Sequence, residues 1–382
     1  MAEIVVPAGD ATAVVVYSRR TFTHAIRSTT AAKLMAVGLK ADDQTNFVQL
    51  FDETMKGPGD TIKYDLIPNI IGPGVLGDNP IAGQEQAWAA LQDTMTINQQ
   101  RQAELLKGRM SQQRVPYSMR DSAKVTLANW MKTIINTGMM NQLGGNTAQT
   151  DVSYTGLQTP VAPDAAHTIF AGTATTEATL TSAMPFSVNL IPLAVAKAQG
   201  SLAFPIKPVV IKGVEIAGVL FIHPLQVKAL KVNFTAGEWA DIYRAALTGG
   251  QITGNPIFTG AIGMYENVVI HQDAYVPALD NAQNLVYDPV AAAMVAAPTS
   301  LGAVATGTTS VARGVFAGAQ AGAIGFGAAD QMDGKPLRVR WYEELLDAGN
   351  QLRVTAGMVW GFKKTRFASQ DYATITISSW AA

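Results

Sequence analysis

The fold of this chain is decided by residues 57–68, which read Gly-Pro-Gly-Asp-Thr-Ile-Lys-Tyr-Asp-Leu-Ile-Pro, and by residues 94–98, which read Thr-Met-Thr-Ile-Asn. Apolar and polar side chains alternate in both stretches, which is typical of strands with one buried face. The connection between them is far too long for a tight hairpin, and its first half is rich in glycine and proline. Connections of that length are usually functional or disordered. The sequence therefore predicts two half-buried strands joined by a projecting arm.

The arm is too apolar for a free linker, because it carries several isoleucine, valine and leucine side chains and one tryptophan. We expect it to lie on a surface, and we expect that surface to belong to another copy of the protein. For Trp88 two interpretations have equal weight, namely an anchor on a neighbouring subunit and a ring packed locally. The residues predicted to contact a neighbouring copy are Tyr64, Ile70, Ile71, Val75, Leu76, Asp78, Asn79 and Trp88.

Composition supports a protein that hides much of its surface. The chain has 382 residues, of which 48% are apolar and 15% are charged. Soluble chains typically carry roughly 25% charged residues, and a low charge content favours permanent contacts between subunits. No apolar run approaches the ~18 residues of a transmembrane helix. Residues 1–7 lack the basic region of a secretory signal, so we expect none.

Charge and cysteine content exclude several functions. The net charge is −1, and the largest basic cluster is Lys-Lys-Thr-Arg at 363–366, so we expect no direct grip on nucleic acid. The absence of cysteine removes disulfides and thiolate chemistry and fits folding in a reducing cytoplasm.

No pattern for catalysis, a cofactor or a metal stands out. The four histidines (His24, His167, His223 and His271) lack metal-ligand spacing. His223 and His271 each end a predicted strand, so a metal site is conceivable there, but structural histidines are the better interpretation. The glycine-rich residues 322–327 resemble a dinucleotide turn only weakly and favour a flexible loop. We assign no catalytic, cofactor-binding or metal-binding residue.

The strongest predicted helix spans 118–143. Ser118 can cap it with Asp121 three positions on, and glycine at 138 or at 144–145 ends it. At ~1.5 Å per residue it is roughly 35–40 Å long, long enough to act as a spine. Its apolar stripe consists of Ala123, Leu127, Trp130, Met131, Ile134 and Ile135.

Other elements follow from shorter patterns. Residues 31–40 and 47–55 predict helices, the second from Phe47, Leu50, Phe51 and Met55. Residues 146–183 contain few large apolar side chains and predict a surface excursion or a small insertion. A central α+β block follows, with helices at 190–199, 224–232 and 238–247 and strands at 209–211, 219–222, 257–258, 268–270 and 285–287. The last fifty residues predict an antiparallel meander that packs on the long helix.

Several collinear segments carry a family resemblance. They are residues 59–64, 72–80, 110–120, 223–224, 255–261, 318–321 and 347–351. With these segments the sequence resembles the major capsid protein family of N4-like tailed bacteriophages, which has the HK97-type capsid fold. It departs from that family at Gln84-Glu85, where an acidic Leu-Glu-Gly-type sequence is usual, and at Ser118, where aspartate is common. Residues 146–185 match it least.

The resemblance implies an α+β protein with an extended loop, a peripheral domain built on a spine helix, and an axial domain. The implied divisions are an N-terminal arm and helices (1–56), the extended loop (57–107), the spine helix (108–145), an insertion and crossover (146–208), the axial domain (209–330) and the C-terminal strands of the peripheral domain (331–382).

The function implied is that of a major capsid protein. Such a chain self-assembles into hexamers and pentamers of an icosahedral shell around double-stranded DNA, with scaffolding, portal and decoration proteins as partners. The expected location is the virion capsid, assembled in the bacterial host cytoplasm, with no cofactor and no membrane contact. The alternatives are another self-assembling component, such as a tail-tube or encapsulin-like shell protein, and a cytosolic oligomeric enzyme with an unrecognised site.

Overall fold

A computed structural model describes residues 46–51, 55, 59–68, 74–85, 90–106, 108–211, 214–233, 261–279, 284–302, 310–332 and 335–381. The predicted helices at 31–40 and 238–247 and the predicted strand at 257–258 lie outside these residues.

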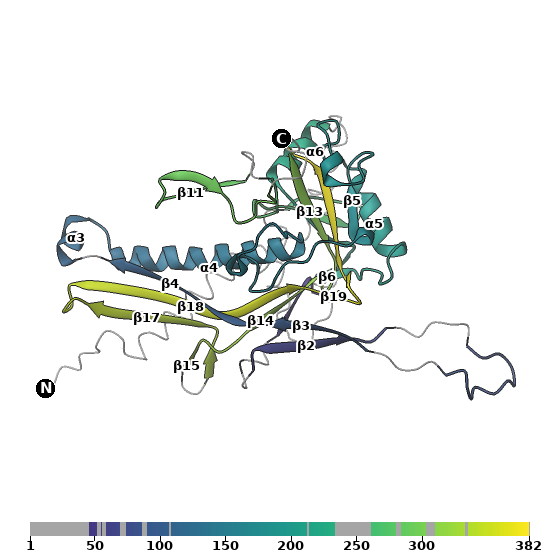
Figure 1. The fold of residues 1–382 in the computed structure, drawn as a ribbon, viewed down its shortest axis with the longest axis horizontal. Coiled ribbons are helices and arrows are strands. Elements are labelled where there is room, and N and C mark those ends of the chain that lie inside the picture. Colours follow the sequence, from purple (N-terminus) through teal and green to yellow (C-terminus); the bar gives the residue numbers. More distant parts are fainter. Residues whose placement is uncertain are drawn as a thin grey trace.

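Two sheets organise the described chain (Figure 1). The five-stranded sheet contains β1 (Val48–Phe51), β4 (Asn98–Leu106), β14 (Gly322–Phe326), β17 (Val339–Leu346) and β18 (Gln351–Lys364). The six-stranded sheet has the order β5 (Thr168–Phe170), β21 (Thr374–Trp380), β13 (Val311–Ala317), β8 (Gly218–Ile222), β10 (Val268–Gln272) and β9 (Ala261–Tyr265).

Helix α4 (Met119–Leu143) is the predicted spine. Ser118 is its N-cap, and the Ser118 hydroxyl accepts a hydrogen bond of 3.3 Å from the Asp121 backbone N–H. The helix lies along β4 and β18 (Figure 1), and the predicted stripe is buried there except Trp130, which is half-buried. Gly138 does not end the helix. A Cβ at this position would lie 2.7 Å from the Gly156 nitrogen and 3.0 Å from the Trp360 ring, so glycine permits close packing. Gly144 ends the helix instead.

The prediction of a short helix at 47–55 is wrong. Residues 48–51 form β1, which pairs in parallel with β14 from Val48↔Gly322 to Phe51↔Gly325. Phe47 and Leu50 are buried. Three/four spacing over so few residues fits a strand as well as a helix. The partner strand, about 270 residues later in the chain, decides between them.

The prediction for residues 146–183, a surface excursion or a small insertion, misses the part of the segment that belongs to the core. This segment forms the 3-10 turns η2 (Val152–Tyr154), η3 (Ala165–His167) and η4 (Glu177–Thr179), and β5, which pairs in parallel with β21. Several of its apolar side chains, including Ile169, Ala171 and Leu180, are part of the core. Amide side chains of α4 hold its backbone: Gln142 donates to the carbonyls of Thr155 and Gln158 at 2.7 and 2.8 Å. Part of the polar composition here therefore serves hydrogen bonding in the interior rather than solvation.

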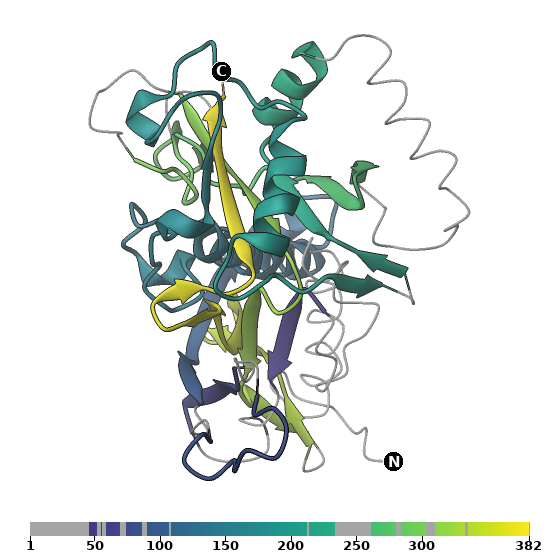
Figure 2. The same cartoon turned by 90° about the vertical axis from the view of Figure 1, so that its right-hand side faces the viewer.

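The remaining elements complete the body. Helix α3 (Arg109–Arg114) precedes α4, and helices α5 (Leu190–Gly200) and α6 (Pro224–Asn233) confirm the helices predicted at 190–199 and 224–232. Viewed end-on from the arm, β21 (yellow) stands upright beside teal helices (Figure 2). Small two-stranded sheets are β2 (Thr61–Leu66) with β3 (Leu91–Thr96), β6 (Val209–Ile211) with β7 (Val214–Ile216), β11 (Leu285–Asp288) with β12 (Ala293–Ala296), β15 (Asp330–Met332) with β16 (Lys335–Leu337), and β19 (Arg366–Phe367) with β20 (Gln370–Asp371).

The predicted C-terminal meander is correct for two strands and wrong for the third. Strands β17 and β18 pair antiparallel, β18 packs on α4 as expected, and Arg120 of α4 forms an ion pair with Glu343 of β17. Strand β21 leaves them and pairs with β13 and β5 in the six-stranded sheet. The chain therefore crosses between the two sheets at residues 365–373. The domain divisions given by the family resemblance stay predictions.

The His223 side chain caps the N-terminus of α6, and it can do so only while its imidazole is neutral. Its Nδ1 accepts a hydrogen bond of 3.3 Å from the Leu225 backbone N–H, and the Gln226 side chain accepts one of 3.1 Å from the His223 backbone N–H. Protonation of Nδ1 would break this cap and place a cation at a helix N-terminus. Burial lowers the pKa of His223 to about 4.

We predict an acid-dependent loss of stability at this cap. Between pH 6.5 and pH 4 the unfolded chain binds a proton at residue 223 and the folded chain does not, so the free energy of unfolding falls by about 3 kcal/mol. Above pH 6.5 this contribution is constant. His223→Asn keeps a capping acceptor and should remove that part of the pH dependence in denaturant unfolding of unassembled protein. Identical pH profiles for the two proteins would contradict the assignment.

Candidate intersubunit surfaces

The arm begins on a rigid root formed by β2 and β3, which pair antiparallel from Thr61↔Thr96 to Leu66↔Leu91. Ile62, Met95 and Ile97 form a buried cluster with Ala323 of β14. The alternation predicted for both stretches is confirmed. The root is therefore part of the body, and only the segment beyond Leu66 and Leu91 is free to project.

Tyr64 fixes the direction of this root. Its ring stacks on Phe51, with centroids 5.5 Å apart, and its hydroxyl donates to the Asp93 carboxylate at 2.8 Å. Lys363 forms an ion pair with the same carboxylate. Burial, together with the negative charge of Asp93, raises the pKa of Tyr64, so the hydroxyl stays protonated and continues to donate.

The tip of the arm projects beyond the body (Figure 1). Three large apolar side chains of the described arm residues are exposed: Ile67, directly after β2, by 61%, and Leu76 and Ile81 in the tip by 76% and 67%. Local turns shape it, since Asn79 donates from its side chain to the Leu76 carbonyl at 2.8 Å and the Gln84 N–H donates to the Ile81 carbonyl at 3.0 Å. A shaped tip with exposed apolar groups is what a docking element needs.

The residues predicted to contact a neighbouring copy fall into three groups. Leu76, Asp78 and Asn79 are exposed at the tip, and Val75 beside them is half-exposed. Tyr64 faces its own body at the root. Ile70, Ile71 and Trp88 lie outside the described residues. The intersubunit contact of all eight stays a prediction.

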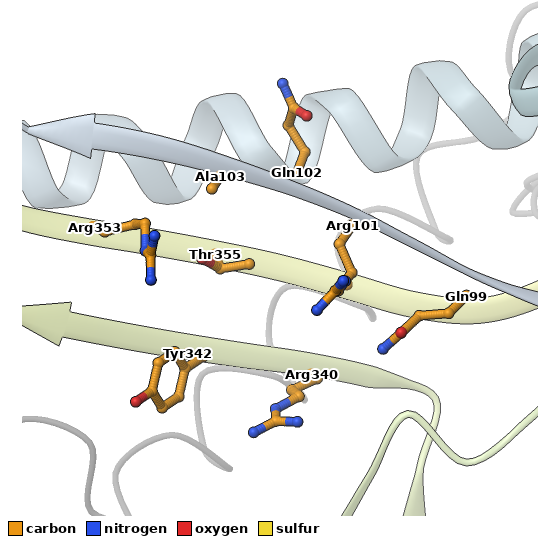
Figure 3. Close-up of a pocket in the computed structure, with 9 residues that line it drawn as sticks. Gln99, Arg101, Gln102, Ala103, Arg340, Tyr342, Arg353 and Thr355 are labelled. Carbon is orange, nitrogen blue, oxygen red and sulfur yellow. The ribbon is translucent and has the colours of Figure 1, made fainter.

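A basic groove lies on the face of the five-stranded sheet that points away from α4 (Figure 3). It has a volume of about 500 Å³. Arg101, Arg340 and Arg353 line it, whereas the Gln102 side chain points towards the helix (Figure 3). The lining residues are Gln99, Arg101, Gln102, Ala103, Arg340, Tyr342, Arg353, Thr355 and Gly357.

Strand register creates the groove. Gly357 of β18 lies opposite Arg101 of β4 on one side and opposite Arg340 of β17 on the other. A Cβ at Gly357 would lie 2.8 Å from the Arg101 side chain. The missing side chain therefore leaves a hollow between two guanidinium groups. Sequence analysis did not find this site, because its residues are far apart in the chain. The sequence signal that could have indicated it is the presence of arginine on the polar face of each of these strands: Arg101 in β4, Arg340 in β17 and Arg353 in β18.

The groove keeps an excess of positive charge. Arg353 forms an ion pair with Glu344, and Arg340 lies 3.9 Å from the Asp330 carboxylate and 5.6 Å from the centre of the Tyr342 ring. Arg101 adds a third positive charge to the lining, which contains no acidic residue. The arm has the opposite character: residues 67–90 contain Asp78 and Glu85 and no lysine, arginine or histidine.

The candidate metal site has no support in the described part of the chain. His223 and His271 are both buried, and His223 is used in the α6 cap. Among the residues that the structure describes, no three histidine or acidic side chains gather as metal ligands would. Within the same residues, no helix is both long and apolar enough to cross a membrane.

Comparison with known proteins gives a consistent result. The family described as "Phage capsid protein" matches residues 5–382. The major capsid protein of Pseudomonas phage KPP25 is 25% identical over 338 residues, covering 82% of this chain and 81% of that protein. The capsid of Ralstonia phage GP4 is 26% identical, with a TM-score of 0.72 and coverage of 89% of this chain and 88% of that one.

The fold extends to more distant structures. The capsid of Cyanophage Pam1 is 17% identical with a TM-score of 0.62, over 91% of this chain and 93% of that one. The narrower resemblance to N4-like phages stays a prediction. The chain belongs to the phage capsid protein family and is a major capsid protein of tailed phages with the α+β fold of the HK97 type.

Proposed function

We propose that the chain assembles with copies of itself, as hexamers and pentamers, into an icosahedral shell that encloses double-stranded DNA. The observation that carries this proposal is the arm, whose apolar tip is exposed beyond the body that holds its root. Exposed apolar surface of this kind is stabilised by burial against a partner, at roughly 25 cal/mol per Å². A neighbouring copy supplies that surface in a closed lattice.

The basic groove is the docking surface that we propose for the arm. The two elements are complementary in charge, with acidic residues in the arm and arginines in the groove. They also lie towards opposite ends of the molecule, since the arm extends to the right in Figure 1 and β17 and β18 to the left. An arm therefore meets the groove of a neighbour rather than its own. Contacts between two different faces of identical subunits form rings when the rotation from one subunit to the next closes.

Other partners follow from the family resemblance alone. We propose scaffolding, portal and decoration proteins as partners, and assembly in the bacterial host cytoplasm. The role is structural, without catalysis. A net charge of −1 suits a container that encloses DNA without holding it tightly.

The first test is the shape of the product. The purified chain, expressed alone or with a scaffolding protein, should form closed shells in negative-stain electron microscopy. Tubes, or dispersed protein under both conditions, would contradict the proposal.

Charge reversal tests the pairing of arm and groove. Arg101→Glu with Arg340→Glu should reduce the assembled fraction at least tenfold, because about 1.4 kcal/mol per contact gives a factor of ten. Adding Asp78→Lys and Glu85→Lys to the same chain should restore assembly. Arg114→Glu, which reverses an exposed arginine on α3, is the matched control and should assemble normally. The measurement is sedimentation velocity at low and moderate salt, and failure of the reversed arm to restore particles would argue against the pairing.

A further inference from the structure

A second apolar element projects from the described body. Strands β11 and β12 form a hairpin with the pairs Leu285↔Ala296 and Tyr287↔Met294. Residues directly opposite each other share one face of a ribbon, so these four form a continuous apolar face. On it Tyr287 is 61% exposed and Met294 59% exposed, and Val290 at the hairpin's end is 94% exposed.

The root of this hairpin is held firmly. The Ala297 N–H donates to the Asn284 carbonyl at 2.9 Å, and the Ser300 hydroxyl donates to the same carbonyl at 3.2 Å. The Asn284 side chain also hydrogen-bonds the Thr299 hydroxyl. The body thus presents the hairpin in a fixed direction, which lowers the entropic cost of docking it.

Composition restricts what can cover the hairpin. A two-stranded ribbon is at best marginally stable in water by itself. Residues 285–296 contain a single charged side chain, Asp288, and its carboxylate already accepts a hydrogen bond of 2.8 Å from the Val290 N–H. Without a basic side chain the hairpin cannot neutralise the phosphates of a nucleic acid. Its complement is an apolar protein surface.

The direction of the hairpin indicates which protein that is. In Figure 1 it extends to the left, away from the arm, and lies on the α4 side of the molecule. The basic groove lies on the other side of the sheet. A chain that closes into a shell of identical copies needs contact faces at both ends.

We propose that the β11–β12 hairpin packs its apolar face on a second copy of this chain, and that this copy is not the one whose groove holds its arm. The inference rests on the proposed shell function. Arms then join subunits at one end of the molecule, and hairpins join them at the other. Assembly requires both contacts.

Excision of the hairpin tests the proposal. Because Asn284 and Ala297 are already hydrogen-bonded, residues 285–296 can be replaced by a two-residue Asn-Gly turn. The expected result is a folded protein with an unchanged circular dichroism spectrum that forms arm-dependent oligomers but at least tenfold fewer closed shells. Tyr287→Thr with Met294→Thr should give the same loss, and Leu193→Gln, at an exposed leucine of α5, should not.

The outcomes separate this inference from the shell function itself. If the unmodified chain forms no shells under any condition, the proposed function fails. If the unmodified chain and the excised chain form shells in equal amount and of equal melting temperature, the hairpin proposal alone is overturned.

Crosslinking provides a readout in the intact chain. The protein has no native cysteine, so Val290→Cys introduces a unique thiol. Shells made from a mixture of ¹⁴N- and ¹⁵N-labelled chains, carrying a benzophenone maleimide at that thiol, should yield mixed-isotope crosslinked peptides after irradiation. Crosslinks within one chain only would overturn the proposal, whether or not the excised variant folds.

Discussion

Replacing residues 67–90 with an Asn-Gly turn will leave a folded protein that no longer forms particles. Leu66 and Leu91 are the last pair of the β2–β3 ladder, so a two-residue turn closes it without strain. Among its described residues (67–68, 74–85 and 90), the segment removed contains the exposed apolar groups of the tip and none of the buried core. The circular dichroism spectrum should be unchanged and the melting temperature of unassembled protein should fall by less than about 4 °C, the shift that roughly 1 kcal/mol produces in a large domain.

Loss of assembly should be essentially complete. Each subunit loses the free energy of one intersubunit contact, and this loss is repeated at every subunit of the shell. A control chain with a Gly/Ser arm of the original length separates the role of the side chains from that of the connection. It should also fail to assemble. Sedimentation velocity and electron microscopy measure both proteins, and particles of normal size from either would refute the role of the arm.

Asp371→Asn will be the most destabilising single change in the body. Lys364 and Asp371 are each 1% exposed, with 2.8 Å between Nζ and Oδ2. Arg366 lies 3.0 Å from the other carboxylate oxygen, and the Asp371 N–H donates to Asp164 at 2.8 Å. These groups lie where the chain crosses between the two sheets. Removing the carboxylate charge leaves a buried lysine uncompensated, which costs about 3–5 kcal/mol.

The variant should also change its pH dependence. Burial lowers the pKa of Lys364, and Asp371 opposes that effect in the native protein. Without Asp371 the folded protein holds Lys364 neutral, while the unfolded chain binds a proton up to its ordinary pKa of about 10.4. The unfolded state then binds more protons, so the free energy of unfolding rises with pH and the defect shrinks in alkaline solution.

Two further variants make this prediction specific. Adding Lys364→Met should recover much of the loss, because the buried lysine charge that has lost its partner is then removed. Lys124→Gln, which breaks the exposed Lys124–Asp121 pair, should change stability little. Guanidinium unfolding at several pH values measures all of them, and a loss below about 1 kcal/mol for Asp371→Asn would contradict the account.

Local chemistry made part of the fold predictable. The α4 helix has a capping serine, a first-turn aspartate and a long periodic stripe, so three independent signals agree. The β2 and β3 strands alternate cleanly beside glycine and proline. Such elements can be predicted from their own residues, without reference to the rest of the chain. The resemblance to capsid proteins was equally accessible, because its motifs are local.

The wrong predictions share a physical cause. Strand β1 is stabilised by β14, β5 by β21, and β21 by β13, so their states depend on partners far away in sequence. The basic groove is the extreme case: Arg101 and Arg340 meet only because both strands flank Gly357. Neither the sheet to which a strand belongs nor the neighbours of a side chain across it are encoded in a local pattern.

Electron cryomicroscopy of particles assembled from the unmodified chain tests the central claim most directly. The account predicts closed shells in which residues 67–90 of each subunit lie on the sheet face of a neighbour, with Asp78 and Glu85 beside Arg101, Arg340 and Arg353. Particles in which the arm folds onto its own subunit, or in which that groove is empty in every copy, would contradict it.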